Sequence, residues 1–267
     1  MSENILEKII EKKKERLIND KKKFPLEKIY EDIEAENHPS FSFIDFKEKI
    51  QSNIKNNKIS IIAEIKKASP SAGVIIEDYE PGKIAKKYFE ENATCLSVLT
   101  EQDFFLGHPA HILRAKYYAK LPVLCKDFFI DKYQVPFAKR MGADAILIIL
   151  AAVSDNVANE LYEEALKLNM SVIVEVHTVE EAQKALNYKN ALIGINNRNL
   201  KTLKTDINAT YDIYDVVKNH KGPLISESGI KNKEELLDLK NKTSINTFLI
   251  GESLLKNLDE NSIFSVL

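Results

Sequence analysis

Eight short apolar segments recur along the chain from residue 60 onward, and their regular spacing constrains the fold more than any other feature. An apolar run bounded by polar segments indicates a buried strand. Between these runs lie stretches whose apolar residues recur at helical spacing. The expected strands cover residues 60–65, 95–100, 122–126, 145–150, 171–176, 191–196, 223–226 and 247–251.

The intervening helices complete a repeating unit. They are expected at residues 83–91, 110–120, 134–141, 155–168, 179–186, 209–218 and 233–241. Seven intervals separate Ser60 from Thr247, so one unit averages about 27 residues, near the size of a βα unit. Eight such units predict an α/β protein with a (β/α)8 barrel. The count argues against an open doubly wound sheet, and the first strand lacks the Gly-x-Gly-x-x-Gly turn of dinucleotide-binding folds.

Residues 1–57 are expected to form an N-terminal helical extension, and residues 58–267 the barrel, within a single domain overall. Residues 4–22 carry a narrow apolar stripe at helical spacing, and residues 40–50 indicate a second short helix. The basic run at 12–22 is interpreted as a solvated helix face, because acidic residues are interspersed. Contact with a membrane or nucleic acid is the less favoured alternative.

Composition narrows the class of protein. A length of 267 residues suits one barrel, and a formal net charge of -2 gives no electrostatic footprint for nucleic acid. No apolar run approaches the roughly 18 residues of a membrane span, and the N-terminus lacks the apolar core of a signal peptide. Cys95 and Cys125 lie in apolar runs, where buried free thiols are expected rather than a disulfide. These features predict a cytoplasmic protein with no membrane partner.

Polar side chains follow most of the expected strands, at the ends where barrels carry their chemistry. Glu64 and Lys66 share one face of the first strand, because residues two apart in a strand point the same way. Unpaired charges are costly to bury, so packing alone does not account for these groups. The remaining groups at the strand ends are Lys126 and Asp127, Glu175, Asn196 and Arg198, Glu227 with Ser228 and Gly229, and Gly251 with Glu252 and Ser253.

Each group also has a structural interpretation. Glu64 and Lys66 could form an ion pair at the barrel mouth, Lys126 could pair with Asp127, and Glu175 could cap the next helix. Asn196 and Arg198 could organise the loop after the sixth strand. Their joint occurrence at one predicted face favours a site.

The histidines give no metal signature. His177 is expected beyond the end of the fifth strand and is interpreted as structural. His108 and His111 lack a third convergent ligand in the sequence, so no metal site is expected.

The last two loops contain small residues at the usual phosphate position of barrels. Ser228 and Gly229 follow the seventh strand, and Gly251, Glu252 and Ser253 follow the eighth. Small side chains let backbone N–H groups approach an anion. Glu252 carries the wrong charge for a phosphate ligand, so its side chain is expected to point away. Simple tight turns are the alternative.

Seven motifs stand at the strand ends: IIAEIKKASPSAG, SVLTEQDFFLG, PVLCKDFFIDKYQV, VEVHTVEEA, IGINNRNLKT, SESGI and IGESLL. In this order and spacing they resemble the indole-3-glycerol-phosphate synthase family, over nearly the whole chain. The most diagnostic pieces are AEIKKASPS, the KDF after the third strand, and INNRNL. Cys125 and Glu252 depart from the pattern at positions where relatives are expected to vary, and neither departure removes a catalytic group.

The resemblance implies a lyase of tryptophan biosynthesis that acts on a small phosphorylated molecule. Its substrate would be 1-(2-carboxyphenylamino)-1-deoxyribulose 5-phosphate, and its products indole-3-glycerol phosphate, carbon dioxide and water. No cofactor is expected, because the iminium formed on condensation serves as the electron sink. A monofunctional, monomeric enzyme is implied.

The resemblance also implies residue roles. Lys126 would protonate the attacked carbonyl, Glu175 would act as base in the dehydration, and Lys66 would hold the substrate carboxylate or act as the second acid. Glu64 would orient both lysines. Which lysine protonates at which step stays open. The other implied roles are substrate positioning for Asn196, Arg198 and Ser228, an apolar wall for Phe105 and Phe128, and phosphate binding for Ser69, Gly229, Gly251, Glu252 and Ser253.

Two rival functions use the same fold. A sugar-phosphate isomerase would keep the glycine-containing loops but would not need Glu64, Lys66, Lys126 and Glu175 together. A non-catalytic phosphate-binding or scaffold protein would leave these acids and bases free to drift, and their joint presence argues against it.

Overall fold

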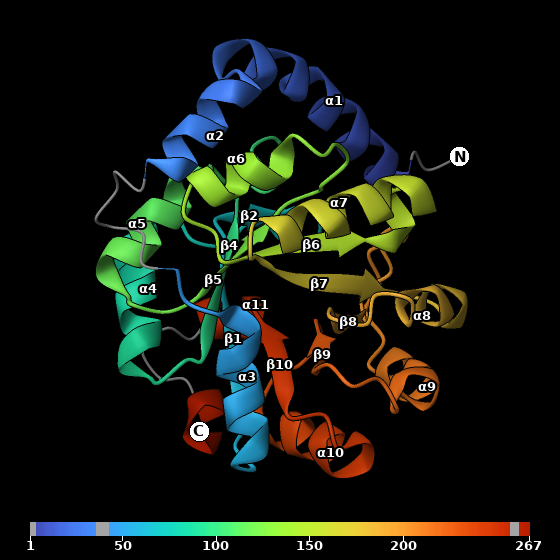
Figure 1. Cartoon of the computed structure of the whole chain (residues 1–267). Helices are drawn as coiled ribbons and strands as arrows, with labels where there is room; N and C mark the ends of the chain where they lie inside the picture. The colour runs from blue at the N-terminus through green and yellow to red at the C-terminus, as the bar shows by residue number, and fades with distance from the viewer. Residues whose placement is uncertain (1–3, 36–42, 257–261) are drawn as a thin grey trace.

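The eight expected strands close into one parallel barrel in the computed structural model, which describes residues 4–35, 43–256 and 262–267. Around the barrel the strands follow the order β1-β10-β9-β8-β7-β6-β5-β4, so the first strand pairs with the last (Figure 1). This confirms the (β/α)8 prediction, and each strand lies within one residue of its expected bounds. The strands are β1 (Ser60–Ile65), β4 (Cys95–Leu99), β5 (Val123–Lys126), β6 (Ala145–Ile149), β7 (Ser171–Val176), β8 (Leu192–Asn196), β9 (Leu224–Glu227) and β10 (Thr247–Ile250).

Seven helices connect successive barrel strands within the described ranges, and their bounds agree with prediction to within two residues. Side-chain caps explain several starts: Ser154, Thr178 and Asn232 each accept a hydrogen bond from a backbone N–H in the first turn. The helices are α4 (Pro81–Glu90), α5 (Ala110–Tyr118), α6 (Gln134–Arg140), α7 (Asp155–Lys167), α8 (Val179–Ala185), α9 (Asn208–Val217) and α10 (Lys233–Thr243).

Several short elements were not predicted, because each is too brief to show a period of its own. A small antiparallel hairpin follows β1, and one turn of helix follows β10. These elements are β2 (Ala68–Ser69), β3 (Gly73–Val74), the 3-10 segments η1 (Leu150–Ala152) and η2 (Ser262–Val266), and α11 (Glu252–Lys256).

Three helices precede the barrel: α1 (Ile5–Lys23), α2 (Leu26–Glu34) and α3 (Phe46–Lys55). Figure 1 shows α1 and α2 arching together over one side of the barrel, with α3 elsewhere on its surface. The sequence pattern missed α2, and it placed α3 too early, at 40–50. Residues 40–42 of that prediction lie outside the described residues. The division into an extension and a barrel at residue 57 stays a prediction.

The helices α1 and α3 cover opposite ends of the barrel. At the amino-terminal end, Lys47 of α3 donates its backbone N–H to Ser171 at the start of β7. At the carboxyl-terminal end, Lys13 of α1 contacts Asp127, directly after β5. The interpretation of the basic run as a solvated face is therefore wrong for Lys13, whose side chain is only 7% exposed.

No helix within the described ranges has both the length and the apolar character needed to cross a membrane.

Candidate active site

Alternation along each strand decides which polar groups enter the barrel. On β1, Ile61, Ala63 and Ile65 pack in the layer between strands and helices, whereas Ile62 packs with the interior group. Because side chains alternate with a period of two, Glu64 lies on the interior side with Ile62. The same argument follows from Leu124 for Lys126, from Ile173 for Glu175 and from Ile225 for Glu227. These charged groups therefore form the last interior layer at the carboxyl-terminal end.

Two groups of opposite charges occupy this layer. Lys126 Nζ lies 3.0 Å from Glu175 Oε2 and 2.7 Å from Glu227 Oε2, and all three side chains are at most 14% exposed. Lys66 Nζ donates to Glu64 Oε1 at 2.6 Å. Of the two lysines that Glu64 was expected to orient, it hydrogen-bonds Lys66. It acts on Lys126 through its charge.

Two structural alternatives are excluded by these contacts. Lys126 does not pair with Asp127, because neighbouring residues of a strand point to opposite faces and Asp127 turns toward α1. Glu175 does not cap α8, since the Thr178 side chain accepts from the Glu181 N–H instead. The ion pair of Glu64 and Lys66 does exist, but it lines the cavity described below.

Burial and neighbouring charges give the two carboxylates beside Lys126 different pKa values. Burial raises the pKa of Glu227 and Lys126 opposes the rise, but repulsion from Glu175 adds to it and brings the pKa to about 7. Burial also acts to raise the pKa of Glu175, but Lys126 and His177 outweigh it and lower that pKa. Burial acts to lower the pKa of Lys126, but the carboxylates of Glu175, Glu227 and Glu64 hold it well above its ordinary value. At neutral pH, Lys126 is thus an ammonium and Glu175 a carboxylate.

His177 lies past the end of β7, as expected, yet it touches the site. Its Nε2 is 3.2 Å from Glu175 Oε1, and its Nδ1 is 3.3 Å from Glu181 Oε2. Burial lowers the pKa of His177, but these two carboxylates outweigh burial and raise it to about 9. Glu175 is therefore held between two cations, Lys126 and His177.

Glu227 also lines this site, and the sequence pattern placed it at a strand end without giving it a role. Its Oε1 is buried and has no hydrogen-bond partner among the described residues. The carboxylate occupies the space that a side chain at Gly194 of β8 would fill, and Glu64 likewise occupies the side-chain position of Gly251. Glycine within a strand marks such a close approach, so Gly194 was the signal available in the sequence.

A cavity of about 750 Å³ opens above this layer, within the range of small-molecule sites. It brings together every residue predicted for the site. Leu6 and Ile9 of α1, which were not predicted for the site, also line it. The predicted residues in its wall are Glu64, Lys66, Ser69, Phe105, Lys126, Phe128, Glu175, Asn196, Arg198, Ser228, Gly229, Gly251, Glu252 and Ser253.

An aromatic wall forms one part of the cavity. Phe105, from the loop after β4, and Phe128, from the loop after β5, have ring centroids 6.2 Å apart in a tilted arrangement. Both pack with Leu6 and Ile9 in the interior apolar group. This wall suits a flat apolar ring.

The loops after β9 and β10 form another part of the cavity wall. Ser228 and Gly229 both have positive φ, 67° and 86°, which turns the backbone sharply at the cavity wall. Glu252 contacts Lys256 at 2.6 Å and Arg198 at 3.5 Å, so two cations that line the same cavity offset its charge. The hydroxyl of Ser253 donates to the Ile230 carbonyl, which leaves any role of Ser253 in anion binding to its backbone.

Arg198 and Asn196 organise the loop after β8 and also face the cavity. The Arg198 backbone N–H donates to Asn196 Oδ1 at 3.0 Å, and the Arg198 guanidinium donates to Ser71 Oγ in the loop between β2 and β3. The structural and functional interpretations of this pair are therefore compatible.

In the described ranges, no three His, Cys, Asp or Glu side chains are grouped so as to hold a metal ion.

The fold and this site define a class: (β/α)8 barrels with paired acids and bases at the carboxyl ends of the strands. A solved structure of tryptophan synthase subunit alpha from Legionella pneumophila shares the fold, with a TM-score of 0.56 and 12% identity, over 83% of this chain and 93% of that chain.

Sequence comparison identifies the family within this class. The family model for indole-3-glycerol phosphate synthase matches residues 6–266. A protein of that name from Burkholderia multivorans is 40% identical over 253 residues, 95% of this chain and 94% of that protein. One from Polynucleobacter asymbioticus is 39% identical over 99% of this chain and 98% of that protein. The chain belongs to the indole-3-glycerol phosphate synthase family.

Proposed function

We propose that this cavity converts 1-(2-carboxyphenylamino)-1-deoxyribulose 5-phosphate into indole-3-glycerol phosphate, carbon dioxide and water. As a member of its family, the chain is a carboxy-lyase of tryptophan biosynthesis. One observation carries the assignment of the chemistry to this site. It is the buried ammonium of Lys126 between two carboxylates of unlike pKa, inside a cavity with an aromatic wall.

Lys126 is the proposed general acid. Ring closure joins the ring carbon that bears the carboxylate to the carbonyl carbon of the sugar chain, and the carbonyl oxygen must then take a proton. The surrounding carboxylates keep Lys126 protonated, so the proton is available at neutral pH. Carbon dioxide then leaves from the ring carbon, and the iminium nitrogen within the substrate receives the electron pair. A positioned acid of this kind supplies about 10²–10⁴-fold in rate.

The role of base, which we expected of Glu175, belongs to Glu227 in this proposal. Dehydration needs a base to take a proton and an acid to release the hydroxyl group as water. Glu175 stays ionised and keeps Lys126 charged. Glu227 has a pKa of about 7, which suits a base that takes up and returns a proton near neutral pH.

Lys66 and Glu64 act as the second pair. Lys66 lines the cavity and is held by one oxygen of Glu64, so its remaining N–H bonds can bind the substrate carboxylate or release the hydroxyl group. Asn196 and Arg198 position the sugar hydroxyls.

The substrate's two ends fit different walls. Its aromatic ring lies against Phe105 and Phe128, between the ends of β4 and β5 and the side of α1. Its phosphate lies at the loops after β9 and β10, where Ser228, Gly229 and the segment 251–253 line the cavity, with Ser69 also in the cavity wall. Glu252 contributes its backbone there.

The proposal also includes a cofactor-free reaction in a cytoplasmic monomer. Cys95 and Cys125 are unpaired and buried, which fits a reducing compartment. Sedimentation velocity measures the oligomeric state directly.

A fluorescence assay tests the function, because the chain contains no tryptophan and any indole signal must come from product. Purified protein mixed with the carboxyphenylamino-deoxyribulose phosphate, without added metal or cofactor, should develop indole fluorescence at a rate proportional to protein concentration. Folded protein that gives no signal contradicts the assignment.

A further inference from the structure

A buried ion pair joins α1 to the strand that carries Lys126. The buried residues of α1 are Leu6, Ile9, Lys13 and Leu17, at helical spacing. Three are apolar, and the fourth is a lysine whose Nζ lies 2.6 Å from Asp127 Oδ1, with both side chains at most 10% exposed. Burying a charge pair is a poor way to gain stability, because desolvation offsets the attraction. Its place on a docking face therefore calls for another explanation.

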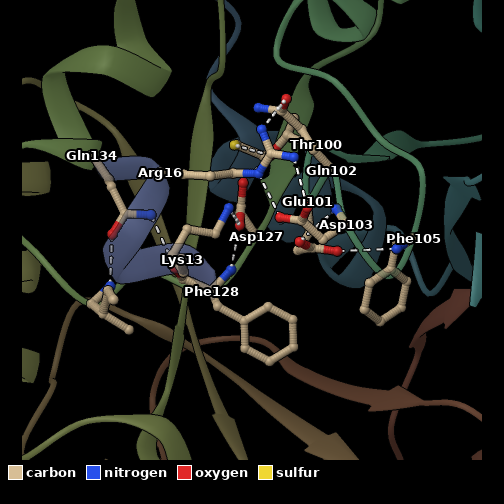
Figure 2. Close-up of polar contacts among 12 residues, drawn as sticks. Lys13, Arg16, Thr100, Glu101, Gln102, Asp103, Phe105, Asp127, Phe128 and Gln134 are labelled. Atoms are coloured by element: carbon tan, nitrogen blue, oxygen red, sulfur yellow. Dashed lines mark hydrogen bonds and ion pairs between the residues drawn. The ribbon is translucent and has the colours of Figure 1, made fainter. Parts of the chain in front are cut away.

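Asp127 is the centre of a small network that surrounds the end of β5 (Figure 2). Its Oδ1 also accepts the Phe128 N–H at 2.7 Å, and its Oδ2 accepts the Thr100 hydroxyl at 2.6 Å. The Thr100 N–H in turn donates to the Lys126 carbonyl at 3.1 Å. Lys126 and Phe128, the residues on either side of Asp127, are thereby held through it to α1 and to the end of β4.

A second carboxylate fixes the other phenylalanine of the aromatic wall. Glu101, which is 1% exposed, accepts hydrogen bonds from the N–H groups of Asp103, Phe104 and Phe105 at 2.7–3.0 Å. Arg16, one turn along α1 from Lys13, donates to Asp103 in the same loop. Figure 2 shows Lys13 and Arg16 directed at these two neighbouring loops. Lys13 and Arg16 of α1 thus form ion pairs with the two loops that carry the aromatic wall.

We infer that Lys13 is a positioning residue: through Asp127 it fixes Phe128 and the backbone of Lys126, and it seats Leu6 and Ile9 of α1 against the aromatic ring of the substrate. Lys13 itself does not line the cavity, whereas Asp127, Phe128, Leu6 and Ile9 do. The effect of Lys13 on the reaction is therefore indirect and falls mainly on substrate affinity. The kinetic part of this inference rests on the proposed function.

The kinetic test compares Lys13→Met with Lys14→Met, its exposed neighbour on the same helix. Lys13→Met should raise KM about tenfold with little change in kcat, because a buried contact of this kind couples by roughly that amount. Lys14→Met should match the wild type. A folded Lys13→Met protein whose KM equals that of Lys14→Met overturns the inference, whatever its melting temperature.

A double variant separates the ion pair from independent effects. If Lys13 acts through Asp127, the KM of Lys13→Met/Asp127→Asn should be no higher than that of the worse single variant. Multiplied effects would contradict the coupling. Should Lys13→Met fail to fold, Thr100→Val removes one donor to Asp127 with little change in shape, and it should raise KM by a smaller factor. An unchanged KM in that variant overturns the inference.

Hydrogen exchange supplies a readout that needs no substrate. In Lys13→Met the peptides that contain the Phe128 amide and those of α1 should exchange at least about tenfold faster than in Lys14→Met, while the α7 peptides stay unchanged. If wild-type protein gives no indole signal, the proposed function fails, and exchange alone decides the positioning role. Equal exchange in the two variants rejects that role.

Discussion

Each end of the barrel buries a lysine against carboxylates, and the two arrangements differ in how completely their hydrogen bonds are satisfied. At the amino-terminal end, Lys116 donates to both oxygens of Asp144 and to the Gly142 carbonyl, at 2.7–2.9 Å. Asp144 also accepts the N–H groups of Ile44 and Val123. At the carboxyl-terminal end, Lys126 has two competing carboxylates and borders a cavity, and one oxygen of Glu227 lacks a partner.

The difference separates stability from reactivity. The Lys116 group pairs one lysine with one carboxylate, is buried, and is linked to α3 through the backbone of the segment before that helix. The Lys126 group contains two carboxylates for one ammonium, and the pKa values of the two carboxylates differ. A proton can therefore be donated and accepted within the group at small cost in free energy. The same residue types therefore anchor the fold at one end and provide acid–base chemistry at the other.

Breaking the amino-terminal pair should have the largest effect. Lys116→Met leaves Asp144 as a buried carboxylate without its cation, which should lower the free energy of unfolding by about 3–5 kcal/mol. The kcat of the remaining folded protein should be unchanged. Urea unfolding checks the first expectation, with the exposed Lys120→Met as control. A large loss of kcat in folded Lys116→Met would contradict the conclusion that the amino-terminal end serves stability and not the reaction.

Removing Lys126 at the carboxyl-terminal end should lower turnover and leave the protein folded. Lys126→Ala should fold, yet its turnover should fall by at least roughly 10²-fold, because the proton donor is gone. Circular dichroism and the indole assay measure the two properties on the same sample. Near-normal turnover would exclude Lys126 as the acid.

The smallest expected change is a change in the pH profile that distinguishes the two carboxylates. A base must be ionised, so kcat/KM should rise with pH through about 7, where Glu227 loses its proton. Glu227→Gln should abolish this limb. Glu175→Gln should move it to lower pH, since repulsion from Glu175 helps to raise the pKa of Glu227.

The substrate phosphate also titrates below neutrality, but its contribution is common to all three proteins. Identical limbs in wild type and Glu227→Gln would assign the base elsewhere.

Much of this site was predictable from the sequence, because strand alternation fixes which side chains point inward. The directions of Glu64, Lys66, Lys126 and Glu175 follow from their apolar neighbours alone. Their partners do not: Lys126 and Glu227 are 101 residues apart, and the choice of carboxylate depends on the order and stagger of the strands around the barrel. That is why Glu64 was expected to serve both lysines and Glu227 received no role.

The N-terminal helices were the least predictable part. The lysines of α1 look alike in sequence, and only the docked position of the helix singles out Lys13 as the one that is buried against a carboxylate. His177 was placed correctly beyond β7, but its contact with Glu175 depends on how the loop turns back.

Because β1 pairs with β10, the reaction can also be used to measure how fast the barrel folds. Ser60 is aligned with Thr247, so the barrel closes only after nearly the whole chain has been ordered. The groups around Lys126 come from β5, β7 and β9, and the phosphate loops follow β9 and β10. Contacts of such long sequence separation form slowly. The rate at which turnover recovers after dilution from denaturant therefore reports when the β-barrel closes, whereas circular dichroism reports helices that form earlier.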